Sequence, residues 1–454
     1  MKTKFFACLL AALTLTVPSG RAAGLVAHEW GTFTSVQGSD GELIAWNPIT
    51  NSELPGFVYE RNRALNPVAP NRALSFSKSM NLWLQRMETP VIYFYTDTPA
   101  RVTATVDFPD GLVTEWFPRA TEFGPRADKR SFIRWTGVEV RPGADETRLP
   151  SDQAGHHYFA ARETDSAVVT VTSNGALSLT AESEKFLFYR GVGNFKTPLH
   201  ARFEQGKLVL LNRGGEEMPH LFLLEVRGMQ ARTAPLPALG GGGDAAVEFA
   251  GGVTSWRSLA EVRAELAATL ERALVDAGLY PREAAAMVKT WNESWFTEPG
   301  TRVLYLLPRA WTDRVLPLKL EPSPRELVRV MVGRAEIFTP EAEGILGALR
   351  ASQPRPDQRP ALLQRLRADG FGRFAEPALA RSELIEPEVR TPVLSTSSGR
   401  GSSTDCAGGS PLLINGTLKV PSTYILNPPL RATWHERNAT SPIHPGLSLG
   451  VPPQ

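Results

Sequence analysis

The stretch RVTATVDFPDGLVTEWF, residues 101–117, indicates the fold class of this chain. Apolar and polar residues alternate from 101 to 108, and Pro, Asp and Gly follow at 109–111. Strict alternation predicts a β-strand with one buried face, and these three residues are typical of turns. The stretch VVTVTSNGALSLT, residues 168–180, repeats the pattern around Asn174-Gly175, which predicts a type I′ hairpin turn. The first half of the chain therefore reads as antiparallel β-structure.

Beyond the glycine cluster at 238–252 the hydrophobic period changes from that of a strand to that of a helix. Ser258 and Glu261 have the spacing of a capping box, and Gly278 ends the periodic run that follows. Pro281 can start a second helix that reaches about Trp295. The sequence predicts an α+β protein, mainly β. We expect an N-terminal antiparallel β-sandwich-like domain followed by a smaller α+β domain with a helical hairpin.

The N-terminal residues have the features of a secretory signal peptide. Lys2 and Lys4 precede an apolar run over residues 5–17 and a small-residue segment, and we expect cleavage after Ala22. The expected organisation is a signal peptide at 1–22, an antiparallel β-rich domain at 23–237, a Gly-rich linker at 238–252, an α+β domain at 253–386 and a low-complexity, partly disordered tail at 387–454. This organisation indicates a periplasmic or secreted bacterial protein.

The charge balance argues against nucleic acid as a partner. The chain has 49 Lys and Arg against 47 Asp and Glu, mixed along its length, whereas a nucleic-acid-binding surface needs a clustered excess of basic residues. Loss of the signal peptide also removes Cys8, which leaves Cys406 without a cysteine to pair with in the chain. No later run approaches the roughly 20 apolar residues of a membrane span, so we expect no integral membrane span.

Histidines are the residues on which a metal site would depend. The motif HEWGT at His28 begins like the zinc-protease motif H-E-x-x-H but lacks its second histidine. Because neighbouring residues on a strand point to opposite faces, we expect His28 and Glu29 to diverge. His200 alternates with charged residues and is expected to be a solvated strand histidine.

Two functions remain open, and the leading one is binding or assembly by an exported envelope or extracellular protein. Tryptophans in the β-rich half favour a glycan or an envelope protein as partner, although most should be core residues. The alternative is a metal-dependent secreted hydrolase with a divalent transition metal such as zinc, copper or iron. Its metal ligands would come from His28, His156, His157 and His220, and its general base would be Glu29 or Glu163.

Four segments resemble a group of uncharacterised secreted proteins from environmental bacteria. They are HEWGTFTSV, LPGFVYERN, RMETPVIYFYTD and VMVGRAEIFTPE. The resemblance covers the chain from Ala27 to about Leu384. It implies that the two halves form one architecture, and it carries no activity and no catalytic residue over to this chain.

Overall fold

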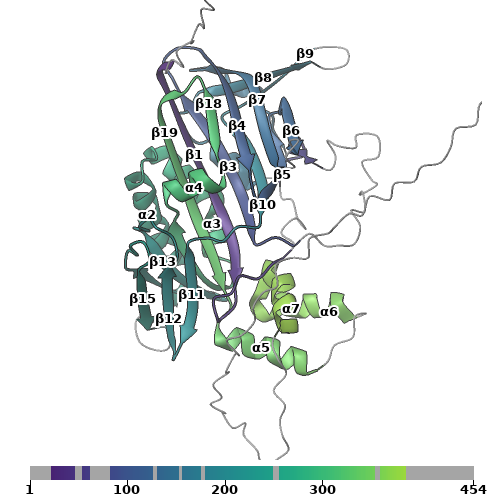
Figure 1. Cartoon of the computed structure of the whole chain (residues 1–454), viewed down its shortest axis with the longest axis vertical. Coiled ribbons are helices and arrows are strands. Elements are labelled where there is room, and N and C mark those ends of the chain that lie inside the picture. Colours follow the sequence, from purple (N-terminus) through teal and green to yellow (C-terminus); the bar gives the residue numbers. More distant parts are fainter. Residues whose placement is uncertain are drawn as a thin grey trace, which may run out of the picture. The chain divides into compact units, whose positions relative to one another are not determined.

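Two long strands from opposite ends of the described chain lie side by side at the centre of the fold. In the computed structural model, β1 (Ala22–Gln37) pairs in parallel with β19 (Pro324–Ile337), as Figure 1 shows. Both strands are buried along most of their length, although each carries buried polar or charged residues such as Glu29 and Arg334. The structure describes residues 22–46, 54–61, 82–125, 130–152, 156–174, 179–248, 255–352 and 358–384.

These two strands belong to a ten-stranded sheet, which we call the central sheet. Its strand order is β16-β14-β13-β17-β19-β1-β3-β10-β5-β2. The strands not yet given are β2 (Tyr59–Glu60), β3 (Gln85–Tyr95), β5 (Gly111–Phe117), β10 (Leu187–Gly193), β13 (Leu221–Arg227), β14 (Gln230–Leu236), β16 (Arg257–Ser258) and β17 (Gly300–Leu306).

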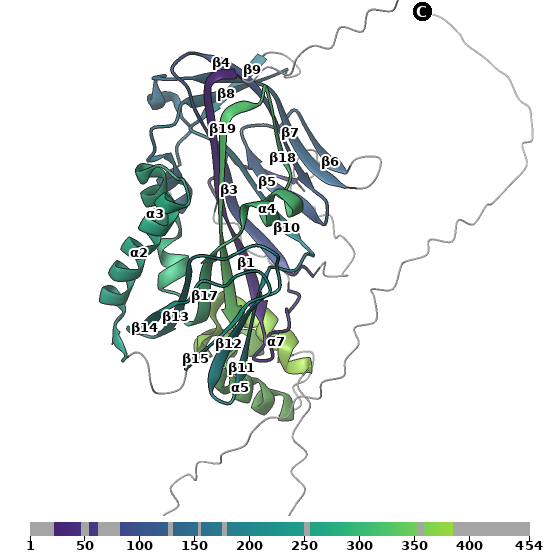
Figure 2. The same cartoon turned by 60° about the vertical axis from the view of Figure 1, so that its left-hand side comes forward.

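Helices cover one face of the central sheet. These are α2 (Leu259–Asp276), α3 (Pro281–Phe296) and the short η2 (His157–Arg162), and Figure 2 shows α2 and α3 along one side. Trp30 of β1 and Tyr93 of β3 point to this face and join the helices in one apolar cluster. We call this side the helical face.

Two further sheets cover the opposite face. One contains β18 (Leu318–Glu321), β4 (Ala100–Phe108), β7 (Ser131–Arg141), β8 (Val168–Asn174) and β9 (Leu179–Glu184), with β6 (Glu122–Pro125) paired to β7. The other contains β11 (Leu199–Glu204), β12 (Lys207–Asn212) and β15 (Asp244–Glu248). Val102, Val106 and Phe108 of β4 pack there with Phe33 of β1. The alternation expected for residues 101–108 is confirmed, and sheets packed face to face give the expected sandwich-like core.

Shorter helices complete the structure. They are η1 (Glu146–Arg148), α4 (Arg309–Val315), α5 (Pro340–Ala351), α6 (Arg359–Leu366), η4 (Arg367–Phe371), η5 (Gly372–Phe374) and α7 (Ala375–Leu384). The helices from α5 to α7 form a small apolar cluster with Val36 at the end of β1 and with Trp46. No helix among the described residues is long and apolar enough to cross a membrane.

The two expected domains share one sheet. β13 and β14 precede the expected linker at 238–252 and β17 and β19 follow it, yet all four are neighbours in the central sheet. Residues 244–248 of that linker form β15. All described residues belong to one compact unit. Composition could not reveal this, because the strands that join the two halves are far apart in the chain. Residues 1–21 of the expected signal peptide at 1–22, and the expected tail at 387–454, lie outside the described residues.

The expected turn at Asn174-Gly175 and the expected capping bond of Ser258 need correction, whereas the two expected helices are present. Asn174 pairs with Leu179, so β8 and β9 are joined by residues 175–178, outside the described residues, and not by a two-residue turn at Asn174-Gly175. Ser258 precedes α2, but in the described structure its side chain makes no capping hydrogen bond. The helical hairpin itself is confirmed, and the chain is mainly β with helices, as expected.

Candidate functional site

Charged side chains cross the helical face of the central sheet near the C-terminal end of α3. Five strands contribute to them. Residues two apart on one strand, such as Arg86 and Glu88, point to the same face of the sheet. We call this group the charged band, and it consists of Arg86, Glu88, Glu115, Arg190, Arg302, Arg334 and Glu336 on the strands, together with Glu298 and Arg373.

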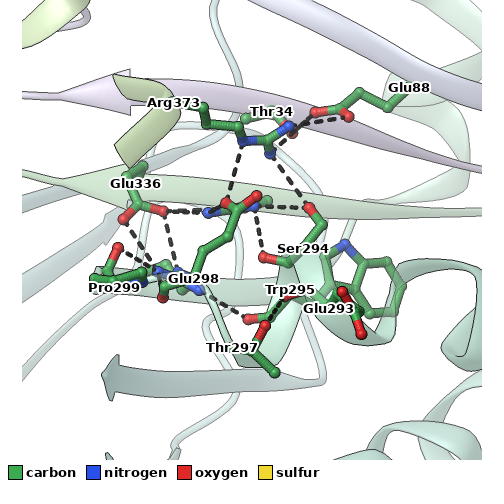
Figure 3. A network of polar contacts seen from close by, with 12 residues as sticks. Thr34, Glu88, Glu293, Ser294, Trp295, Thr297, Glu298, Pro299, Glu336 and Arg373 are labelled. Atoms are coloured by element: carbon green, nitrogen blue, oxygen red, sulfur yellow. Dashed lines mark hydrogen bonds and ion pairs between the residues drawn. The ribbon is translucent and has the colours of Figure 1, made fainter. Parts of the chain in front are cut away.

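One end of the charged band is paired, and Figure 3 shows Ser294, Glu298 and Glu336 within its network of polar contacts. Arg334 donates from Nη1 to the Ser294 carbonyl at 2.7 Å, and from Nη2 to Glu298 at 2.8 Å and to Glu336 at 2.9 Å. Burial alone would lower the pKa of Arg334, but the charges of Glu298 and Glu336 raise it above its usual range. This arginine is therefore satisfied in the protein itself.

Arg302 is paired in the same way. Its Nε donates to Glu336 at 3.1 Å and its Nη1 to the Trp295 carbonyl at 3.0 Å. The last carbonyls of a helix have no partner within the helix, and the two arginines supply donors to them. Arg302 and Arg334 thus stabilise the end of α3 on the sheet.

Arg373 of η5 joins the charged band from the C-terminal helices. Its Nη1 and Nη2 each donate to Glu88 at 3.3 Å, and its Nε lies 3.1 Å from Glu298. Glu88 also accepts a hydrogen bond from the Thr34 hydroxyl at 2.6 Å. Burial alone would raise the pKa of Glu88, but the charges of Arg373 and Arg86 hold it far below its usual range.

Arg190 of β10 differs from these arginines. Its side chain is buried, with the residue 3% exposed, yet Nε and Nη1 have no hydrogen-bond partner among the residues that the structure describes. Its one hydrogen bond to the described residues runs from Nη2 to the Thr89 hydroxyl at 3.5 Å. Burial, followed by the charge of Arg86, lowers the pKa of Arg190 to about 10.

Backbone irregularities occur on both sides of Arg190. The pairing of β10 with β5 shifts between Arg190 and Gly191, and Thr89 of β3 has a positive φ of 49°. A bulge turns a side chain away from the direction that regular pairing would give it, and a β-branched residue at positive φ is strained. Such features gather at binding and catalytic sites, where the surrounding structure maintains them.

His157 lies near Arg190, at the end of the charged band opposite to Arg302 and Arg334. Its ring centroid is 5.6 Å from that of Trp291 on α3, and its Nε2 is buried without a partner in the described part of the chain. Burial, and then the charge of Arg190, lowers the pKa of His157 to about 4. A neutral imidazole and an unsatisfied guanidinium therefore share one region of the helical face.

The other residues expected at a metal site are spread over the fold. His156 lies 3.5 Å from Asp152, Glu163 pairs with Lys289 at 2.6 Å in an exposed position, and His220 is half-buried just before β13. Glu29 accepts from Tyr189 at 2.5 Å and pairs with Arg329 at 2.5 Å. Within the described ranges, no group of three or more His, Cys, Asp and Glu could hold a metal ion.

His28 and Glu29 point to opposite faces, as expected from strand geometry. Glu29 lies toward the two covering sheets, whereas His28 lies toward the helices and its Nδ1 is 2.6 Å from Oε2 of Glu283 on α3. The same Oε2 accepts the backbone N–H of Tyr280 at 2.8 Å. His28 therefore meets a carboxylate of α3 and neither His156 nor His157.

Sequence reasoning missed Arg190 and Glu283, and it also misplaced His200. Arg190 interrupts the apolar run Leu187–Gly193, which reads as an ordinary buried strand. A lone arginine inside such a run is the signal that could have identified it. His200 is buried and not solvated, since the turn at Gly41 packs against its ring.

No protein-family model and no curated protein matches this sequence. Among solved structures, the chain is similar to the Mu homology domain of Fcho1 from Danio rerio with a bound Eps15 peptide, with 6% identity, a TM-score of 0.26, and coverage of 69% of this chain and 97% of that one. The yeast delta-COP-I mu-homology domain has 8% identity, a TM-score of 0.26, and coverage of 69% and 98%. The same domain with a Dsl1 WxWxV peptide has 7% identity, a TM-score of 0.25 and the same coverage. These values are too low to carry an argument about this chain.

Proposed function

We propose that this protein is an exported bacterial binding protein whose ligand carries an anionic group, with Arg190 as the main binding residue. The observation that carries the proposal is the buried guanidinium of Arg190, two of whose nitrogens have no partner among the described residues. Export is supported by the signal-peptide pattern at 1–22. We infer a periplasmic or secreted location from the same pattern.

An unpaired buried charge needs an explanation because desolvation of an ion is penalised by several kcal/mol in proteins. Arg302 and Arg334 show how this chain satisfies buried guanidinium groups when their role is structural. Arg190 lacks such contacts, and a carboxylate or phosphate on a ligand would provide the missing acceptors.

The surroundings of Arg190 also favour an anion. Arg86 and Arg373 both lie within 4.0 Å of Glu88, and their side chains are 14% and 25% exposed. Arg190 itself carries a third positive charge that no ion pair in the described structure neutralises. These partly exposed arginines would attract an anion from solvent and direct it toward Arg190.

The metal-dependent hydrolase receives less support. It would need His28, His156 or His157, and His220 at one ion, but His28 faces α3 and His220 lies before β13. A glycan partner stays compatible with the proposal if the glycan is acidic, since a uronic acid presents a carboxylate on a sugar ring.

Calorimetric titration of the mature protein tests the proposal. The probes are glucuronate, acetate and inorganic phosphate, with uncharged glucose as the control ligand. We expect at least one anion to bind to the wild-type protein and to lose affinity by about tenfold or more in Arg190→Met, because one charge-assisted contact contributes about 1.5–3 kcal/mol. The matched control is Arg202→Met, which removes a half-buried arginine already paired with Glu204.

Glu115→Gln adds a sharper test. Glu115 is the register partner of Arg190, and its charge competes with that of a bound anion. We expect this variant to bind the same anion more tightly than the wild type. Equal anion affinity in wild type and Arg190→Met, or no anion binding to either, would overturn the proposal.

A further inference from the structure

A pocket of about 460 Å³ lies beside the corner at which the chain passes from β18 to β19. Its described lining residues all belong to the segment 318–327, which consists of β18, the corner Pro322-Ser323 and the first residues of β19. Figure 1 and Figure 2 show the two strands joined at this corner. The volume is within the range of pockets that bind small ligands.

β18 is the outermost strand of its sheet, so one of its edges has no strand neighbour in the described structure. The Asp107 N–H donates to the Pro317 carbonyl at 2.9 Å, which identifies the residues whose backbone faces β4. In an antiparallel pair, alternate residues direct their backbone groups to the partner strand and the residues between them direct theirs away. The N–H and carbonyl groups of Leu318 and Leu320 therefore point off the free edge, and no described residue is hydrogen-bonded to them.

The first half of β19 also has a free edge at this pocket. β17 pairs with β19 only over Val332–Ile337, so the earlier residues of β19 have β1 as their one strand neighbour among the described strands. The Leu327 carbonyl accepts from Nη1 of Arg309 on α4 at 2.7 Å, and Nη2 of Arg329 donates to the Leu316 carbonyl at 2.8 Å. These two contacts tie β19 to α4 and to the residue after it, and they bound the pocket at the end opposite the corner.

Arg325 gives the pocket a positive charge. It is exposed, and no described acidic side chain lies within 4.0 Å of its guanidinium. The other charged lining residues, Lys319 and Glu321, pair with each other. Leu327 packs on the cluster beneath the covering sheets, and Arg325, two residues earlier on the strand, points to the same side. The pocket thus combines unpaired backbone groups with one unpaired cation.

We propose that this pocket binds the last residues of an extended peptide and that Arg325 contacts the C-terminal carboxylate. Another extended backbone supplies the donors and acceptors that Leu318 and Leu320 lack. β18 has four residues, which corresponds to about 13 Å of extended chain. Because the pocket is bounded at both ends, it suits the end of a chain better than its middle. A carboxylate complements Arg325, whereas an N-terminal ammonium would be repelled.

This pocket is separate from the proposed anion site. Arg325 points to the side of the covering sheets, whereas Arg190 lies near His157 and Trp291 under the helices. Arg190→Met should therefore leave peptide binding unchanged, and Arg325→Gln should leave the binding of small anions at Arg190 unchanged. Each proposal can fail without the other.

The test titrates the mature protein with the peptide acetyl-Gly-Val-Thr-Val and with its C-terminal amide, by calorimetry. The amide lacks the carboxylate, so we expect it to bind more weakly by about tenfold or more. Arg325→Gln should weaken binding of the acid by a similar factor and remove the difference between the two peptides. The matched control is Arg314→Gln, which removes an exposed arginine of α4 outside the pocket. Equal affinities of acid and amide for the wild type, or no binding of either, would refute the proposal.

Amide hydrogen exchange in protein labelled with ¹⁵N-leucine and ¹⁵N-lysine provides the second readout. The Leu318 and Leu320 amides should exchange rapidly and become protected when the peptide binds. The Lys319 amide is the internal control, because it faces β4 and should exchange slowly throughout. Protection that the peptide leaves unchanged would exclude pairing along β18. Slow exchange of the two leucine amides without peptide would show that a second copy of the chain or another segment already covers this edge, which also contradicts the proposal.

Discussion

Arg190 on β10 and Glu115 on β5 are register partners in the central sheet, and both are buried, yet no ion pair within 4.0 Å joins these two described side chains. Glu115 accepts a hydrogen bond from Thr114, its neighbour in the chain. Opposite charges on adjacent strands normally stabilise a sheet. Their separation here leaves Arg190 available to a ligand, and this relationship underlies the first prediction.

Replacement of Arg334 should lower the free energy of unfolding, whereas replacement of Arg190 should leave it almost unchanged or raise it. Arg334→Met removes one of the two arginine partners of both Glu298 and Glu336, and also the donors to Ser294, so we expect the free energy of unfolding to fall by about 3–5 kcal/mol. Arg190→Met removes a guanidinium that is largely unsatisfied, so the free energy should stay within about 0.5 kcal/mol of the wild-type value or rise. Urea unfolding followed by tryptophan fluorescence measures both. A large loss in Arg190→Met would mean that the residue is structural.

Tyr95 and Tyr189 offer a matched comparison of two phenols. The Tyr189 hydroxyl donates to the buried Glu29 at 2.5 Å, whereas the Tyr95 hydroxyl has no hydrogen bond of 3.5 Å or shorter within the described ranges, and only a weaker contact with Glu283. Tyr189→Phe should lower the free energy of unfolding by about 1.5–3 kcal/mol, as expected for a bond to a charged group. Tyr95→Phe should be nearly neutral. Similar losses in both variants would show that Tyr95 is bonded in solution.

His157 should make stability depend on pH. Its folded-state pKa is lowered to about 4, below the value of about 6.5 in an unfolded chain, first by burial and then by Arg190. The unfolded state therefore binds more protons, and stability falls as the pH drops from about 6.5 toward 4. Arg86, Glu88 and His156 are the other charges that act on it.

The measurement is unfolding by urea at several pH values between 4 and 7 for wild type and His157→Gln. One proton corresponds to at most about 1.4 kcal/mol per pH unit, and solvent access to the half-buried ring reduces this. We expect the variant to show a shallower loss of stability on acidification. An identical pH profile in both proteins would contradict the lowered pKa.

Gly41→Ala should lower the melting temperature more than Gly143→Ala, although both glycines have a positive φ. Gly41 has a φ of +81°, and an added Cβ would lie 2.5 Å from the His200 ring. Gly143 has a φ of +63° and nothing within 4 Å of an added Cβ. Both alanine variants carry the backbone penalty of about 1–2 kcal/mol, but only Gly41→Ala adds a clash. The two melting temperatures should therefore differ, and equal losses would show that His200 can move away.

The local elements of this fold could be predicted because their patterns are short in sequence. The alternation at 101–108 identified β4, and the run from Leu259 to Leu274 identified the buried stripe of α2. Pro281 identified the start of α3, which runs from Pro281 to Phe296. Each of these depends on residues within a few positions of one another.

The arrangement of the site could not be predicted because its partners are distant in the chain. His28 and Glu283 are 255 residues apart, and Arg373 is 285 residues from Glu88. Strand geometry did predict that His28 and Glu29 diverge, but it could not say which residues they would meet. Whether a buried arginine is paired depends on the register of neighbouring strands, which composition and period do not contain.

The parallel contact between β1 and β19 has a consequence for how the chain folds. β1 is the first described element, and its partner begins about 300 residues later, so the middle of the central sheet can close only after nearly all of the described chain is available. Contacts of such long range require large loops to close, and they slow folding. A nascent chain that ends before Pro324 exposes one open edge of β1. In such a chain the centre of the central sheet should stay incomplete until β19 has been synthesised.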